Sequence, residues 1–169
     1  FSSIRRHTRW CVRSRGLGDV YKRQTPYKTH LGIQFRHEAA KDVHAPGVYL
    51  HLDPAGSFVG VGIWRPDGAS ALAIRETIVD RPAAWVEATE NLDFASTYTL
   101  DGESLKRPPR GFDAEHPLIE DLKRKDFIAS AKVSRKTATA PDFLDQYASM
   151  SRNATQYMAF LTRALGLPF

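Results

Sequence analysis

Alternating apolar and polar positions predict β-strands in the first half of the chain. One strand is expected over Leu31–Phe35, where every second residue is apolar. Two further apolar runs, Gly47–Asp53 and Phe58–Trp64, flank Pro54-Ala55-Gly56-Ser57, and this spacing is typical of a β-hairpin with a short connection. We therefore expect three early strands, two of which are joined in a hairpin.

The side chains of this hairpin divide between two faces. Tyr49, His51 and Asp53 share one face of the first arm, because successive side chains in a strand alternate. Gly60 and Gly62 share a face of the second arm, and glycine inside a strand indicates that a helix or a ligand approaches closely. The same G-x-G opens no helix, so close packing is favoured over a nucleotide site.

Helical periodicity dominates the rest of the chain. Apolar stripes predict helices over Pro66–Asp80, from Asp80 through Trp85, over Asp113–Lys125 and over Pro141–Leu165. The buried side of the last helix is expected to hold Phe143, Leu144, Tyr147, Tyr157, Met158, Leu161 and Leu165.

Two more strand signals lie among these helices. Thr97–Leu100 and Ser104–Lys106 flank Asp101-Gly102-Glu103, a turn sequence that predicts a second hairpin. Phe127–Val133 is predicted to be the last strand. Strands grouped early, with helices between and after them, predict an α+β fold: an antiparallel sheet with hairpins, covered by helices that include a long C-terminal helix.

Charge is distributed unevenly along the 169 residues, which have a formal net charge of +5. Residues 1–24 hold seven basic residues and one acidic residue, whereas residues 25–169 hold 17 basic and 18 acidic residues. The pI of about 9.5 would otherwise favour nucleic-acid binding. Because the excess charge is confined to the first segment, no nucleic-acid partner is predicted.

The first 24 residues also differ from the rest in kind. Gly18–Gln24 can be encoded by GGA GAT GTG TAT AAG AGA CAG, which resembles the transposase recognition end that a common sequencing-library method joins to DNA fragments. We interpret residues 1–24 as a non-native, adapter-like segment without ordered structure, and residues 25–169 as the C-terminal portion of one α+β domain. The alternative is a native basic tail.

Cysteine usage and hydropathy restrict the possible settings of the protein. Cys11 is the one cysteine of the sequence, so residues 25–169 offer no disulfide and no thiol nucleophile. The sequence shows neither a signal-peptide pattern nor an apolar run long enough to span a bilayer. We therefore expect a cytoplasmic protein without a membrane partner.

No catalytic or metal-binding pattern is complete in the sequence. It contains no P-loop, no G-x-S-x-G elbow and no Cys/His ligand spacing, so no reaction, cofactor or metal is predicted. His30, His37, His44 and His51 recur every seven residues, but the intervening glycines and proline prevent one helix from aligning them. Surface or hydrogen-bonded histidines are favoured over a metal site.

The most distinctive chemistry is a short cluster of cations. Lys106, Arg107 and Arg110 bracket Pro108-Pro109, whose fixed φ angles stiffen the segment. A stiff cationic segment favours binding of a small anionic or phosphorylated ligand. The alternative is a non-catalytic protein-interaction or structural module whose cations form internal salt bridges. The candidate ligand-binding residues are Lys28, His51, Lys106, Arg107 and Arg110.

Five sequence blocks indicate a family. In chain order they are P-Y-K-T-H-L-G (Pro26–Gly32), G-V-Y-L-H-L-D-P (Gly47–Pro54), L-K-R-P-P-R-G-F (Leu105–Phe112), H-P-L-I-E-D-L-K-R-K-D-F (His116–Phe127) and P-D-F-L-D (Pro141–Asp145). They resemble the uncharacterised family called domain of unknown function 2461. The resemblance implies an α+β fold found in bacterial and fungal cytosolic proteins. It implies no established activity and lends no catalytic residue.

Members of that family carry an N-terminal portion ahead of P-Y-K-T, with helices and an arginine-rich strand, where this chain has the adapter-like segment. If that portion is missing, an unpaired strand edge or an apolar patch is expected beside Tyr27–Phe35. Leu31, Ile33 and Phe35 are the residues expected to be exposed. The chain is then expected to be poorly soluble and marginally stable.

Overall fold

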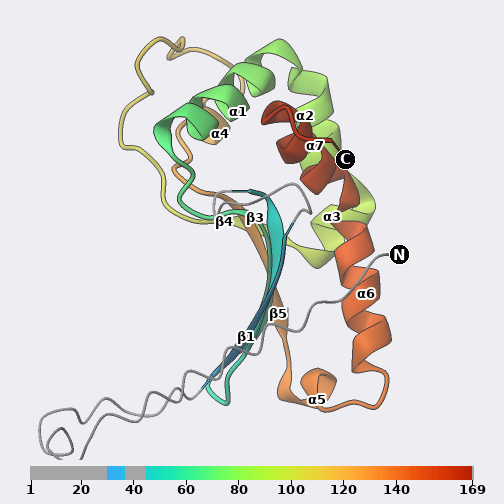
Figure 1. Cartoon of the computed structure of the whole chain (residues 1–169). Coiled ribbons are helices and arrows are strands. Elements are labelled where there is room, and N and C mark those ends of the chain that lie inside the picture. Colours follow the sequence, from blue (N-terminus) through green and yellow to red (C-terminus); the bar gives the residue numbers. More distant parts are fainter. Residues whose placement is uncertain (1–29, 37–44, 169) are drawn as a thin grey trace, which may run out of the picture.

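The computed structural model describes residues 30–36 and 45–168 (Figure 1). One antiparallel sheet has the strand order β1-β2-β3-β5-β4. Its strands are β1 (Leu31–Arg36), β2 (Gly47–Leu52), β3 (Ser57–Ile63), β4 (Thr99–Asp101) and β5 (Phe127–Val133). The described helices are α1 (Gly68–Asp80), α2 (Pro82–Glu90), α3 (Leu92–Thr97), α4 (Ile119–Leu122), α5 (Arg135–Ala138), α6 (Phe143–Asn153) and α7 (Thr155–Ala164). The predicted α+β fold is confirmed, as are the first hairpin and the strand over Phe127–Val133.

The hydrophobic core lies between the sheet and the helices. Figure 1 shows α2, α3, α6 and α7 on one side of the strands and α1 beyond one end of them. Strand alternation directs Val59, Val61 and Ile63 of β3 into this core, where each is buried. Trp85 of α2 is completely buried, and its ring lies 5.2 Å from that of Phe160, centre to centre. Burial of these large apolar side chains supplies most of the driving force for folding.

The glycines of β3 have an explanation different from the one expected. Gly62 has φ +111°, and a Cβ atom there would collide with the carbonyl oxygen of Phe127 in the neighbouring strand. A Cβ atom on Gly60 would meet only ordinary contacts, the nearest being the Phe58 ring at 3.7 Å. The close approach at Gly62 is therefore made by the backbone of β5.

The predicted second hairpin around Asp101-Gly102-Glu103 is wrong. β4 pairs with β5, where Leu100 lies opposite Ala129. The chain after Gly102 turns instead to the segment that precedes β5, since the N–H of Lys125 donates to the carbonyl oxygen of Glu103 at 2.8 Å. The Asp-Gly turn forms, but its two sides have different partners.

Asp126 explains why the chain turns in this way. This carboxylate is 5% exposed and accepts hydrogen bonds from the N–H groups of Arg65, at 2.8 Å, and Glu103, at 3.0 Å. A buried carboxylate requires such donors. Asp126 therefore holds the end of β3 and the end of β4 against the start of β5, and this tertiary contact is not evident in the local sequence.

Most of the helix predicted over Asp113–Lys125 is loop, with only α4 helical. The side chain of Asp113 accepts from the N–H of Glu115 at 3.0 Å, and Nδ1 of His116 accepts from the N–H of Leu118 at 3.1 Å. Side chains that satisfy nearby backbone N–H groups compete with helix formation. The segment therefore forms turns until Ile119.

The long C-terminal helix is divided at Ala154 into α6 and α7. The hydroxyl of Thr155 donates to the carbonyl oxygen of Arg152 at 2.6 Å. At the junction of the two helices this carbonyl oxygen therefore accepts a hydrogen bond from a side chain. Tyr147 and Leu161 are buried as predicted, but Leu144 is 75% exposed, and its predicted burial is wrong. The expected stripe assumed one straight helix.

The apolar edge predicted at the first strand is present. Among the described strands β1 lies at an edge of the sheet, and Leu31, Ile33 and Phe35 are 55%, 38% and 45% exposed. Phe35 reaches Tyr147 of α6, with 5.9 Å between ring centres. Residues 1–24, and with them the adapter interpretation, lie outside the described residues.

Candidate functional site

The cationic loop is anchored at its base and exposed along its length. The N–H of Leu105 donates to the carbonyl oxygen of Lys123 at 2.7 Å, which closes the base of the loop. Within the loop, the N–H of Phe112 donates to the carbonyl oxygen of Pro109 at 3.3 Å. Gly111 takes φ +92°, a backbone conformation that glycine accepts readily. The Pro-Pro segment is thus held in a defined turn.

The three cations of this loop have no acidic partner. Lys106, Arg107 and Arg110 are exposed, and among residues 30–36 and 45–168 none of them forms an ion pair or a side-chain hydrogen bond. The described ion pairs instead use the neighbouring residues Lys123, Arg124 and Lys125, which bind Glu120, Asp121 and Glu103. Internal salt bridges therefore do not account for the loop cations in the described part of the chain.

A half-buried arginine, Arg75, attaches α1 to the segment that closes this loop. Nε and Nη2 of Arg75 each donate at 2.8 Å, to the carbonyl oxygens of Leu122 and Arg124. Burial lowers the pKa of the Arg75 guanidinium from its ordinary value, although the group stays charged at neutral pH. Arg75 thus has a structural role, and it fixes α1 relative to the base of the loop.

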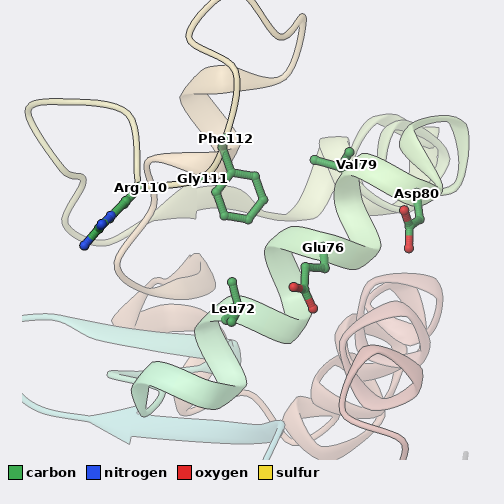
Figure 2. A pocket seen from close by; sticks show the side chains of 7 residues that line it. All are labelled: Leu72, Glu76, Val79, Asp80, Arg110, Gly111 and Phe112. Atoms are coloured by element: carbon green, nitrogen blue, oxygen red, sulfur yellow. The ribbon is translucent and has the colours of Figure 1, made fainter.

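A pocket of about 500 Å³ lies between the end of the loop and α1 (Figure 2). Its apolar wall consists of Leu72, Val79 and Phe112, and its acidic wall consists of Glu76 and Asp80. The remaining lining residues are Arg110 and Gly111. Figure 2 shows the Arg110 side chain pointing away from the two carboxylates. The rim therefore combines a cation with an exposed apolar surface.

The structure does not bring His51 to this loop. Along the sheet, His51 lies opposite Phe58, which lies opposite Lys132. The loop leaves the sheet after Asp101, which lies opposite Ile128. Lys132 and Ile128 are four residues apart on β5, which corresponds to roughly 13 Å along the strand. His51 and the start of the loop are therefore separated by about this distance along the sheet. Lys28, the other predicted site residue, lies outside the described residues.

His51 belongs to a different polar group. Ligand atoms of His30, His51 and Asp53 all lie within 4.8 Å of one another, and the three side chains are half-buried. The sequence placed His51 and Asp53 on one face but predicted no metal, because no ligand spacing indicated one and the four regularly spaced histidines could not be assumed to converge. The available signal for this cluster was a pair of sequence features. His30 comes just before one strand, and His51-Leu52-Asp53 lies at the end of the next.

Comparison with known proteins adds a family and no activity. A family model described as "Conserved hypothetical protein (DUF2461)" matches residues 21–160. No curated protein and no solved structure matched the chain. Within the part of the chain that the structure describes, no helix has both the length and the apolar character needed to cross a bilayer.

Proposed function

Starting from the finding that the chain belongs to the DUF2461 family, whose description names no activity, we propose that this protein binds a small anionic or phosphorylated ligand. The observation that carries the proposal is the exposed trio Lys106, Arg107 and Arg110, which has no acidic partner among the described residues. Cations held together on a stiff turn repel one another, and an anion relieves that repulsion. Arginine also suits phosphate and carboxylate groups by its planar set of donors.

The adjoining pocket supports a ligand with an apolar part. Leu72 and Val79 of α1 are 44% and 38% exposed, and they face the pocket beside Phe112. Covering such side chains contributes about 25 cal/mol for each Å² of apolar surface removed from water. The carboxylates of Glu76 and Asp80 disfavour a second anionic group on the opposite wall. The ligand class is therefore a monoanionic or dianionic head with an apolar tail.

Binding of hexyl phosphate tests this proposal, with inorganic phosphate as the reference ligand. At constant ionic strength, both ligands are expected to raise the thermal unfolding temperature, and hexyl phosphate to act at the lower concentration. Arg110→Ala and the double variant Lys106→Ala/Arg107→Ala should remove the stabilisation. At a ligand concentration of about 100 times the Kd, that stabilisation is about 2.7 kcal/mol.

Lys136→Ala is the matched control, because Lys136 is an exposed cation on α5. It should retain the response to both ligands. Leu72→Ser should remove only the advantage of hexyl phosphate over phosphate. Equal responses in wild type, Arg110→Ala and Lys136→Ala would show non-specific charge binding and reject the proposal.

A protein-interaction module is the second candidate, and the exposed edge of the sheet favours it. β1 presents Leu31, Ile33 and Phe35 at an edge where an added strand could pair. Absence of any anion response, together with self-association that Ile33→Lys abolishes in light scattering, would favour this function over ligand binding.

A further inference from the structure

The pairing of β1 with β2 brings three metal-ligand side chains together at one end of the sheet. Leu31 lies opposite Leu52, and Gly32 lies opposite His51. Continuing this antiparallel register by one step sets His30 opposite Asp53. His51 and Asp53 are two residues apart, so their side chains share a face. Opposite residues have Cβ atoms about 4.5–5.5 Å apart, and the cluster therefore follows from the strand register.

We propose that His30, His51 and Asp53 form a binding site for a divalent transition-metal ion. Their ligand atoms all lie within 4.8 Å of one another, so small side-chain movements suffice to reach one ion at about 2.0–2.2 Å from each ligand atom. Two imidazoles and one carboxylate suit Zn²⁺ and Fe²⁺. Three protein ligands leave coordination positions for water or another molecule.

Tyr49 supplies the support that a metal-binding histidine needs. Its hydroxyl oxygen lies 3.2 Å from Nδ1 of His51, so it can accept a hydrogen bond from Nδ1–H and leave Nε2 as the ligand atom. Histidines that bind metals usually donate their other ring N–H in this way, which fixes the ring orientation. Tyr49 is therefore a positioning residue for His51.

Gly32 makes that arrangement possible. A Cβ atom on Gly32 would lie 2.7 Å from the hydroxyl oxygen of Tyr49 and 3.1 Å from its ring. The tyrosine ring thus lies over the glycine of the neighbouring strand, and a side chain there would displace it. Glycine at this position directs the Tyr49 hydroxyl to His51.

Aromatic packing holds the two histidines close together. The His51 ring stacks on Phe58, with 4.9 Å between ring centres and 22° between planes. The His30 ring lies 4.7 Å from that of His51. All three proposed ligands are half-buried, so water competes with the protein less than it would at an open surface. An apolar surround of this kind strengthens metal–ligand interactions.

The turn of the β2–β3 hairpin positions the carboxylate. Oδ1 of Asp53 accepts from the N–H of Ala55 at 2.7 Å, and the N–H of Asp53 donates to Oγ of Ser57 at 3.1 Å. A carboxylate oxygen accepts through more than one lone pair, so these bonds orient Asp53 without preventing coordination. Metal-binding carboxylates are commonly hydrogen-bonded themselves.

Equilibrium dialysis and calorimetry with ZnCl₂ test the site in the untagged full-length chain, with FeSO₄ tested separately under anaerobic conditions. Wild type is expected to bind one equivalent of Zn²⁺. His30→Ala, His51→Ala and Asp53→Asn should each weaken binding by at least the roughly 10–100-fold that loss of an outer-shell partner causes. Binding that survives in His30→Ala/His51→Ala, or a wild type that binds neither ion, would overturn the proposal.

Two control variants separate this site from other donors in the chain. His116→Asn removes a histidine from the loop but keeps an acceptor for the N–H of Leu118. Cys11→Ser removes the one thiol. Both should bind Zn²⁺ as wild type does, and loss of binding in Cys11→Ser alone would assign the metal to the thiol instead.

Tyr49→Phe and Gly32→Val test the positioning of His51. Tyr49→Phe should weaken Zn²⁺ binding about 10-fold or more and alter the visible spectrum of the Co²⁺-loaded protein, which reports ligand geometry. Gly32→Val should do the same by displacing the tyrosine. Circular dichroism without metal identifies any variant that fails to fold. An unchanged Co²⁺ spectrum and affinity in folded Tyr49→Phe would reject this role for Tyr49.

The site lies at the opposite end of the strands from the cationic loop, so these results are independent of the phosphate experiments.

Discussion

Buried tyrosines illustrate how the environment of a single residue changes its chemistry. Tyr157 is completely buried, and its hydroxyl has no hydrogen-bond partner among the described residues. Tyr98 is also buried, but its hydroxyl donates to the carbonyl oxygen of Met150 at 3.0 Å. Burial raises the pKa of both phenols well above the ordinary value of 10.0, because a phenolate would lose its hydration. Both hydroxyls therefore stay protonated in the folded protein.

This shift predicts a loss of stability in alkaline solution. Below pH 10 the folded and unfolded states both hold these protons, so the contribution is fully present. Above pH 10 the unfolded chain releases them and the folded chain does not, so the free energy of unfolding decreases as pH rises. Urea unfolding at a series of pH values measures the slope. Tyr157→Phe should reduce that slope.

Tyr98→Phe provides the comparison, since it should reduce the slope and also cost about 1 kcal/mol at neutral pH through the lost bond to Met150. Tyr157→Phe should cost nothing at neutral pH, because its hydroxyl has no described partner. An alkaline slope that neither variant changes would contradict the assignment.

The two C-terminal helices, α6 and α7, show that the burial of a leucine depends on its place in the helix as well as on its residue type. Helical spacing in the sequence placed Leu144 and Leu161 on one buried stripe, but α6 and α7 are separate helices. Leu161 is completely buried, whereas Leu144 is 75% exposed. Leu144 lies in the first turn of α6, whereas Leu161 lies in the second half of α7.

The same substitution at these two positions should therefore have different effects. Leu161→Ala should lower the free energy of unfolding by about 2–5 kcal/mol, because it removes buried methyl groups and leaves a cavity. Leu144→Ala should change it by less than about 0.5 kcal/mol. Urea titration of both variants measures the difference. Similar losses would mean that Leu144 is covered in solution.

The strands were more predictable from the sequence than the helices or the candidate sites. Strand alternation has a period of two and is visible over a few residues, so Leu31–Phe35 and Phe127–Val133 were predicted correctly. The break at Ala154 and the turns before Ile119 depend on side-chain hydrogen bonds and tertiary contacts. Similarly, the cationic loop was evident from composition, but the approach of His30 to His51 required the register of two strands.

At the scale of the whole molecule, the described helices cover one face of the sheet, and within residues 30–36 and 45–168 the first strand is incompletely covered even on that face. Figure 1 shows α2, α3, α6 and α7 on one side of the strands. Ile33 of β1 lies opposite the buried Leu50 of β2, yet remains 38% exposed. The core therefore becomes thinner toward β1, and this edge exposes apolar surface to solvent.

Ile33→Thr is expected to reduce self-association without destabilising the fold. Threonine suits a strand, and little apolar surface is lost from the core, so the free energy of unfolding should change by less than about 0.5 kcal/mol. Light scattering over a range of protein concentrations measures the association. Val61→Thr, at a position only 2% exposed, should cost about 1–3 kcal/mol. Equal costs for the two variants would show that β1 is fully covered.

Closure of the cationic loop at its base determines which changes of loop length the fold can tolerate. The backbone bonds from Leu105 to Lys123 and from Lys125 to Glu103 join the two ends of the excursion independently of its tip. Loop length costs little once the ends are fixed. Insertions and deletions between Asp113 and Glu115, beyond the family-like block that ends at Phe112, should therefore leave the pairing of the two ends intact. Under the proposed function, such a change of length would alter ligand binding while the scaffold stays folded.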